Sequence, residues 1–242
     1  MRSIEMGKAI FIFLRKDKRS TVCNPSFFKL QSPQNLFRDR VQAGRQLSKL
    51  LLKYKAEKPM VLALPRGGVV VGYEVSKKLK APFSVIVSRK IPAPQSPEYG
   101  VGAVSEGAFY INRQIVKEVG LNKDQLAVLI KLGEDEVKRR VKLFRRGKKL
   151  PNLREKTVIL IDDGLATGGT AFAAIDALKK LGAKRIIFSA PVCDRRTAKK
   201  LEGKVEFVEC LSYPELSSVG SYYLNFEQVT DEEVVKILEK ER

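Results

Sequence analysis

One stretch of the sequence, residues 158–170, constrains the fold more than any other. It opens with four consecutive aliphatic residues at 158–161 and continues with Asp162, Asp163 and a small-residue loop that ends in Thr-Gly-Gly-Thr. An unbroken aliphatic run without polar alternation is typical of a strand that is covered on both faces of a parallel sheet. Because such sheets bind ligands at the carboxyl ends of their strands, we expect a binding site directly after Ile161.

The loop at residues 166–170 has the composition of an anion-binding site. Gly168 and Gly169 let the backbone approach an anion closely, and Thr167 and Thr170 add hydroxyl donors. A helix that begins near Thr170 would point its free amide groups and the positive end of its dipole at the same position. The loop therefore predicts a phosphate site.

Two carboxylates beside a phosphate site need a separate explanation, because they would repel the anion if they faced it. Asp162 and Asp163 are therefore expected to bind something neutral or cationic, and sugar hydroxyls and Mg²⁺ both fit. The alternative is an ordinary strand-to-helix turn in which the acids cap the helix. A cap accounts for one acid but not for the whole spacing.

A second strand, glycine loop and helix occur earlier in the chain. Residues 60–64 form a short apolar run, residues 65–68 read Pro-Arg-Gly-Gly, and a helix is predicted over 69–79. A molecule with two phosphorylated ends needs two such anion sites, and Arg66 adds a cation. A simple turn with Arg66 in solvent remains an alternative, because a glycine pair after a strand is weak evidence by itself.

The strand, the two acids, the three following residues and Thr-Gly-Gly-Thr resemble the 5-phosphoribosyl-1-pyrophosphate (PRPP) motif of type I phosphoribosyltransferases. The resemblance implies that Asp162 and Asp163 hold the ribose 2′ and 3′ hydroxyls. It also implies that the 5-phosphate and the pyrophosphate of PRPP bind to two loops, consisting of Ala166, Thr167, Gly168, Gly169 and Thr170 and of Pro65, Arg66, Gly67 and Gly68.

Residues 91–107 contain six Pro or Gly residues, too many for a helix, in a segment too long for a plain connector. We expect either a lid or a mobile hairpin, and the resemblance favours a flexible lid that closes over PRPP and excludes water. Arg89 and Lys90, at the root of this segment, are predicted to contact the pyrophosphate. The alternative for both residues is a solvated basic pair.

The resemblance implies that the chain transfers a phosphoribosyl group from PRPP to a small nitrogenous acceptor and releases pyrophosphate. Asp162, Asp163, Lys90 and Arg66 are the predicted catalytic residues. Mg²⁺ is the implied cofactor, held mainly through substrate oxygens with Asp162 and Asp163 as the protein ligands. Position 166 is Ala, whereas purine-type members of the family place an Asp there, which argues against a purine acceptor.

The length and hydrophobic content of the chain suit one full-sized catalytic core. With 242 residues, 44% of them hydrophobic, we predict a basic N-terminal extension at 1–36 and a phosphoribosyltransferase-like domain at 37–242. The expected fold is α/β and Rossmann-like, a doubly wound, mostly parallel sheet with a lid loop and a small hood. The hood is assigned to parts of the tail at 213–226, where Tyr222 or Phe226 either stacks on the acceptor or fills the core, together with the N-terminal region.

Cellular context is predicted from what the sequence lacks. No apolar run approaches 18 residues, so we expect a cytoplasmic protein without a membrane contact, and a homodimer as the commonest assembly. The resemblance implies a role in nucleotide metabolism. There is no His, which excludes His-based triads. Three widely spaced Cys residues without a CxxC pair indicate buried thiols rather than a disulfide or a zinc site.

A formal charge of +19 leaves open a partner other than PRPP. A helix is predicted over 122–146 with Asn122 as its N-cap, and its second half is strongly basic with apolar residues at Val137, Val141 and Phe144. This pattern fits a core-facing stripe with a solvated basic face, or a footprint for nucleic acid. The rival function is therefore a PRPP-sensing regulator that binds nucleic acid, and a weaker one is a PRPP-binding scaffold subunit.

Overall fold

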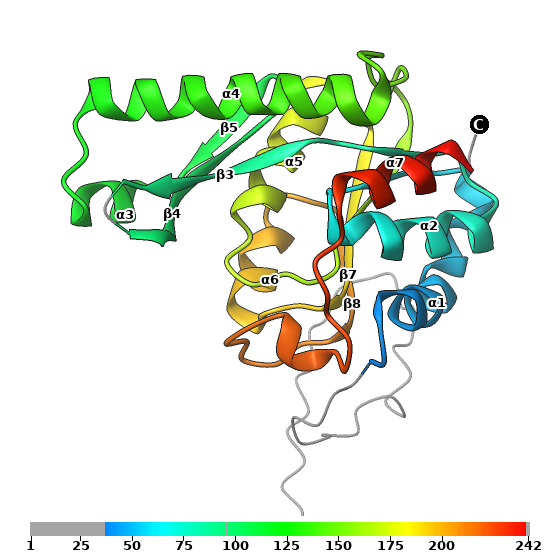
Figure 1. Cartoon of the computed structure of the whole chain (residues 1–242). Helices are drawn as coiled ribbons and strands as arrows, with labels where there is room; N and C mark the ends of the chain where they lie inside the picture. The colour runs from blue at the N-terminus through cyan, green and yellow to red at the C-terminus, as the bar shows by residue number, and fades with distance from the viewer. Residues whose placement is uncertain (1–36, 95, 241–242) are drawn as a thin grey trace, which may run out of the picture. The chain divides into compact units, whose positions relative to one another are not determined.

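The computed structural model describes residues 37–94 and 96–240, so the predicted extension at 1–36 lies outside the described residues. Its main element is a five-stranded sheet with the strand order β2-β1-β6-β7-β8, of which β7 and β8 are labelled in Figure 1. All neighbouring strands in it are parallel. The strands are β1 (Met60–Ala63), β2 (Phe83–Val85), β6 (Thr157–Ile161), β7 (Arg185–Val192) and β8 (Phe207–Ser212).

Helices cover both faces of this sheet. On one face α5 (Gly169–Lys180) and α6 (Arg195–Glu202) pack on a cluster that includes Leu62, Leu160 and Phe188. On the other face α1 (Arg40–Leu50), the 3₁₀ helix η2 (Leu51–Glu57) and α2 (Gly67–Leu79) pack on Val61 and Ile159. Successive strand residues point to opposite faces, so each face needs its own apolar cover. The predicted doubly wound α/β fold is confirmed.

The strand order places a topological switch point between β1 and β6. From β1 the chain continues to β2 on one side, whereas β6 leads to β7 and β8 on the other. Ala63 and Ile161, the last residues of β1 and β6, are paired neighbours. In open α/β sheets ligands bind in the crevice outside such a point, because the connections leave in opposite directions. The two loops that the sequence singled out both begin there.

The segment predicted as a lid or hairpin is a hairpin. Strands β3 (Ser88–Ala93), β4 (Ser96–Ser105) and β5 (Ala108–Ile111) form a separate antiparallel sheet, with register shifts around Pro92. Helix α3 (Arg113–Glu118) follows, and α4 (Lys123–Arg145) lies along β3 and β4. Proline cannot donate to a ladder, which explains the irregular pairing where Pro92 sits. Closure of this hairpin over a ligand stays a prediction.

Helix α4 has the predicted cap and the predicted apolar stripe. Asn122 and Gln125 form a capping box at its start. Val137 and Phe144 are buried in a cluster shared with the C-terminal helix α7 (Asp231–Glu239), and Val141 packs against it. The core-facing interpretation of the stripe is thus correct.

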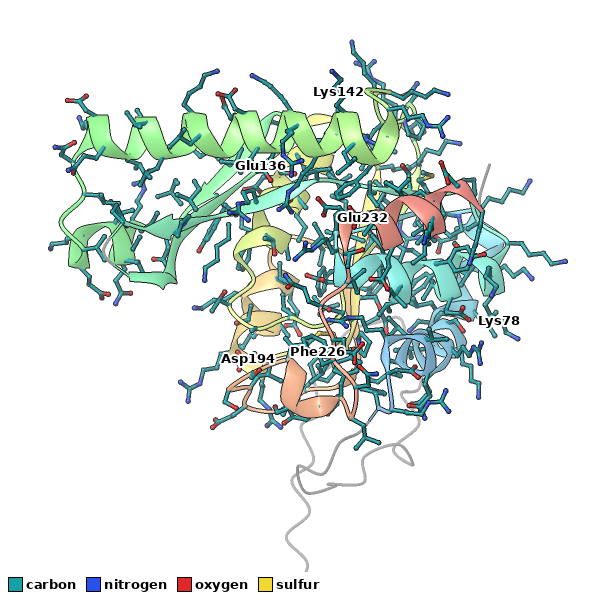
Figure 2. All side chains as sticks on the ribbon, in the orientation of Figure 1. Lys78, Glu136, Lys142, Asp194, Phe226 and Glu232 are labelled. Carbon is teal, nitrogen blue, oxygen red and sulfur yellow. A yellow bond between two sulfur atoms is a disulfide. The ribbon has the colours of Figure 1, made fainter. Side chains whose placement is uncertain are left out.

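The basic face of α4 is largely paired with nearby carboxylates. Glu136, labelled in Figure 2, bonds both Arg139 and Arg140, at 2.8 and 2.7 Å. Asp135 lies 3.4 Å from Lys138, and Glu239 of α7 lies 2.9 Å from Arg146. These ion pairs offset much of the positive charge that binding of a nucleic-acid backbone to this face would require.

Three details correct or complete the sequence-based expectations. Cys193 and Cys210, expected to be thiols, form a disulfide between the end of β7 and β8. The pairing was not foreseen because parallel neighbours bring the two residues together across 17 positions of sequence. The last strand, β8, begins at Phe207 after a bend in which the Glu206 amide donates to the Ile186 carbonyl oxygen. Within the described part of the chain, no helix has the length and apolarity to cross a membrane.

The disulfide predicts how many Cys thiols react with an alkylating reagent before and after reduction. Protein purified without reductant and unfolded in guanidinium should expose one of its three Cys thiols to an alkylating reagent, and all three after reduction. Because the bridge closes a loop of 17 residues, reduction should lower the free energy of unfolding by about 2–4 kcal/mol. Cys210→Ser should abolish the effect of reductant on stability. Three reactive thiols before reduction would show that the bond is absent.

Candidate active site

A cavity of about 150 Å³ lies at the carboxyl end of β6. The predicted phosphate loop, Asp162 and Lys90 of β3 all border it. Its lining residues are Lys90, Asp162, Gly164, Leu165, Ala166, Thr167, Gly168, Gly169, Thr170 and Val219. The space is well above the roughly 10–15 Å³ that a single water needs, and its walls are those predicted to bind a sugar phosphate.

The phosphate loop is held so that the start of α5 faces the cavity. Gly168 caps the helix with φ +75°, a left-handed conformation that glycine adopts without strain. Leu165, just before the loop, donates its amide to Val192 and accepts from Asp194, at 2.8 and 2.7 Å. A side chain at Gly169 would meet no atom closer than 3.9 Å, so open space remains in front of the first turn. The free amides of this turn can bind an anion there.

The two neighbouring acids have different surroundings. Asp162 borders the cavity, and its Oδ1 accepts a hydrogen bond from the Asp163 amide at 2.9 Å. Asp163 is absent from the lining and instead pairs through Oδ2 with Arg40 Nε at 2.7 Å. The Tyr223 hydroxyl donates to the Asp163 carbonyl oxygen at 2.6 Å. The sequence predicted one role for both acids, and of the two Asp162 lines the cavity; the binding of ribose by both stays a prediction.

Burial and the nearby charge of Asp163 raise the pKa of the Asp162 carboxyl well above its ordinary value of 3.8. The backbone hydrogen bond from Asp163 and the charge of Arg40 act in the opposite direction. The ionised form of Asp162 is therefore costly in the free protein. A ligand that donates hydroxyl hydrogen bonds to this carboxylate would offset the cost.

The predicted pyrophosphate loop adjoins the acid pair. A methyl group on Gly67 would overlap the Asp163 carboxylate, and one on Gly68 would come within 2.9 Å of the Asp162 Cα and the Ile161 carbonyl oxygen. Glycine is thus required at both positions by the approach of α2 to the end of β6. Pro65, joined to Arg66 by a cis peptide bond, precedes them.

Two predicted cations, Arg66 and Arg89, do not line the cavity. Arg66 lies 3.7 Å from Asp231 at the start of α7 and borders a separate pocket formed with residues 228–232. Arg89 is exposed on β3. The structure therefore brings Lys90, Asp162 and the loop at 166–170 into one cavity, with residues 67–68 beside the acids, and leaves Arg66 and Arg89 outside it.

The donor set for Mg²⁺ is small. Among the described residues no three Asp, Glu, Cys or His side chains gather to hold a metal ion. Asp162 and Asp163 are the carboxylates at the site, and Asp163 is already paired with Arg40. This set does not suit a metal cage made by the protein, but it fits an ion held mainly by substrate oxygens with one or two carboxylates nearby.

Sequence reasoning missed three side chains at this site: Arg40, Val219 and Tyr223. They lie at least 56 positions from the acids along the chain and come close only through packing. For Arg40 a weak signal existed, because Asp39 caps α1 and places the Arg in its first turn. A cation is disfavoured at that end of a helix dipole, so its presence suggests a partner elsewhere.

The sequence was compared with models of known protein families. A model described as "Phosphoribosyl transferase domain" matches residues 38–223, which span the sheet, both glycine loops and the acid pair. The chain belongs to this family.

Members of the family differ in how much of this chain they resemble. A Mycobacterium tuberculosis protein (strain H37Rv) named "Putative phosphoribosyl transferase" is 37% identical over 207 residues, or 85% of this chain and 47% of that protein. The chain thus spans about half the length of this curated relative. Uracil phosphoribosyltransferase of Geobacillus kaustophilus is 33% identical over 124 residues, covering 51% of this chain and 53% of the relative.

A solved structure is similar to this chain over most of its length. The crystal structure of TT1426 from Thermus thermophilus superposes with a TM-score of 0.71 at 35% identity, over 84% of this chain and 98% of that one.

The raised pKa of Asp162 predicts a pH-dependent stability. Below about pH 4 the carboxyl is protonated in both folded and unfolded chains, so its burial costs little. As the pH rises from the unfolded pKa through the folded pKa, the free energy of unfolding falls by about 1.4 kcal/mol per pH unit, because only the unfolded chain ionises freely. Asp162→Asn keeps the acceptor oxygen and does not titrate. It should therefore stabilise the free protein at pH 8 and have little effect at pH 4 in urea unfolding.

Asp194, labelled in Figure 2, provides a control of opposite sign. Burial alone would raise its pKa, but amide hydrogen bonds from Thr197 and Leu216 lower the pKa overall. Asp194→Asn should therefore destabilise the protein above pH 4, where the charged form is favoured. Equal stability of Asp162→Asn and the unsubstituted protein at pH 8 would contradict the assignment.

Proposed function

We propose that the protein transfers the phosphoribosyl group of PRPP to a nitrogen atom of a small acceptor, with release of pyrophosphate. The observation that carries the proposal is the cavity at the switch point, which is lined by residues at the start of α5, by Asp162 and by Lys90. These groups match the parts of a phosphorylated sugar. The start of α5 suits a phosphate, the Asp162 carboxyl suits sugar hydroxyls, and Lys90 suits a further negative charge.

Each part of PRPP has a binding element in this arrangement. The loop at 166–170 and the first turn of α5 bind the 5-phosphate through backbone amides and the threonine hydroxyls. Asp162 accepts hydrogen bonds from the ribose hydroxyls. The loop at 65–68 adjoins the acid pair and binds the pyrophosphate, with Lys90 supplying positive charge. Arg66 would join this end of the site only by leaving Asp231.

The electrostatics of the site suit a transition state that resembles an oxocarbenium ion. Positive charge grows on the ribose while negative charge grows on the departing pyrophosphate. Carboxylates beside the sugar stabilise the first charge, and Lys90 stabilises the second. Mg²⁺ bound to the substrate would neutralise further charge on the leaving group.

The acceptor is inferred from position 166. Ala166 lines the cavity where an acidic side chain could serve a purine ring nitrogen. Without that group the acceptor must lose its proton unaided, which favours a ring with an acidic N–H. The relative from G. kaustophilus acts by its name on uracil, a base of this kind. We therefore place pyrimidine-like bases first among the candidates.

The rival function, a PRPP-sensing regulator that binds nucleic acid, is less well supported. It relied on the basic half of α4, where Lys138, Arg139, Arg140 and Arg146 are paired with acidic residues. A nucleic-acid site would first have to break these pairs.

A screen of bases tests the proposal. Protein incubated with PRPP, Mg²⁺ and one base at a time should release pyrophosphate with at least one of them, uracil being the first choice. Activity should require Mg²⁺. Failure of every base, together with no measurable affinity for PRPP in calorimetry, would refute the proposal.

Gly169→Ala gives a more specific test of the phosphate site. The added methyl group meets no protein atom closer than 3.9 Å, so the fold should tolerate it. It would, however, occupy space in front of the first turn of α5 and should weaken PRPP binding by about 10-fold or more, since a misplaced ligand loses several hydrogen bonds. Gly203→Ala, at the end of α6 and equally unhindered, is the matched control and should bind PRPP normally.

A further inference from the structure

The first turn of the C-terminal helix α7 lies beside the predicted pyrophosphate loop. Helix α7 contacts both α2, which follows this loop, and α4 (Figure 1). Its first residue is Asp231, directly after the cap Thr230. Asp231 Oδ1 lies 3.7 Å from Arg66 Nη1, and Asp231 Oδ2 lies 3.8 Å from Arg139 Nη2 of α4. One carboxylate thus faces a cation of the loop and a cation of another helix.

Neither contact of Asp231 is a close hydrogen bond, because N–H···O bonds measure about 2.7–3.2 Å. Asp231 Oδ1 is buried and has no hydrogen-bond partner among the described residues. Arg139, by contrast, is held by Glu136, to which it donates through Nε and Nη2 at 2.8 and 3.0 Å. The Arg66 side chain is partly buried and borders a pocket of about 240 Å³. Arg66 is therefore the less firmly held of the two cations, and it has space beside it in which to turn.

The position of this carboxylate matters because the neighbouring loop is proposed to bind another anion. Gly67 and Gly68, directly after Arg66, begin α2 against the acid pair, and the free amides of its first turn suit a phosphate. A guanidinium can bind either a phosphate or a carboxylate, since both accept two parallel hydrogen bonds from it. A pyrophosphate at this loop and the Asp231 carboxylate would therefore compete for the same Arg66 side chain.

We propose that Asp231 is an autoinhibitory residue, which holds Arg66 away from pyrophosphate in the free protein and pairs with it again as pyrophosphate leaves. The inference deepens the proposed function and rests on it. Asp231 keeps compensating charge in both states, because Arg139 and the amides at the start of α7 remain beside it when Arg66 turns away. Since binding must first break the contact with Arg66, Asp231 weakens the affinity for pyrophosphate and favours its release.

Calorimetric titration with pyrophosphate and Mg²⁺ tests the direction of this effect. Asp231→Asn keeps a polar side chain at the start of α7 but removes the charge that pairs with Arg66. Affinity for pyrophosphate should rise about 2- to 5-fold, because a partly exposed ion pair no longer opposes binding. Affinity for ribose 5-phosphate, which is proposed to bind at Asp162 and the loop at 166–170, should stay unchanged. A purely structural role of the pair would have the opposite sign, since a loosened loop binds pyrophosphate less tightly.

A double variant assigns the effect to Arg66. Arg66→Met should lower the affinity for pyrophosphate, and in that background Asp231→Asn should give little or no gain, because its effect passes through the Arg66 side chain. Glu239→Gln is the matched control. It removes a carboxylate from the same helix, but one that pairs with Arg146 at 2.9 Å, and it should leave both affinities unchanged. Asp231→Ser, which also suits the start of a helix, covers a failure of Asp231→Asn to fold.

The outcomes distinguish this inference from the function on which it rests. If the unsubstituted protein binds neither PRPP nor pyrophosphate, the proposed function fails and the inference with it. If it binds PRPP and Asp231→Asn shows no gain in affinity for pyrophosphate, the inference alone is wrong. An equal gain from Asp231→Asn with and without Arg66 would also overturn it, since the carboxylate would then act on the anion directly.

Discussion

Two adjacent carboxylates at the end of a buried strand are the constraint on which the rest of the site depends. Neighbouring negative charges in a shielded position raise each other's energy unless a cation or hydrogen-bond donors compensate. Here the compensation is unequal. Asp163 forms an ion pair with Arg40. Asp162 accepts a hydrogen bond from one backbone amide, and its carboxyl, at the cavity wall, keeps a raised pKa. The free protein thus keeps a carboxyl whose charged form is costly at the position where a hydroxyl-bearing ligand is proposed to bind.

The sheet determines which loops can meet at these acids. Because β1 and β6 are neighbours whose connections leave in opposite directions, the loop after β1 and the loop after β6 open into the same crevice. Gly67 and Gly68 then allow α2 to begin against the acids without overlap. The antiparallel hairpin contributes from a third side, since Lys90 of β3 reaches the cavity.

Local patterns in the sequence predicted the parts of this site that are local in the chain. The aliphatic run at 158–161, the glycine loop at 166–170 and the cap at Asn122 each correspond to an observed element. What escaped prediction depends on distant packing. Arg40 pairs with Asp163 across 123 positions, Val219 packs on Gly164, and Cys193 meets Cys210 only because β7 and β8 are parallel neighbours. Arg66 was placed in the site by its position beside the glycines, and its side chain instead turns to Asp231.

The disulfide stabilises one of the two glycine loops of the crevice, at 166–170, but not the other, at 65–68. Cys193 follows Val192, which holds the amide of Leu165 at the start of the phosphate loop, so that loop is tied to two covalently linked strands. The loop at 65–68 leaves β1, which no such bond secures in the described structure. Oxidising surroundings would thus stabilise the position of the loop at 166–170 more than that of the loop at 65–68.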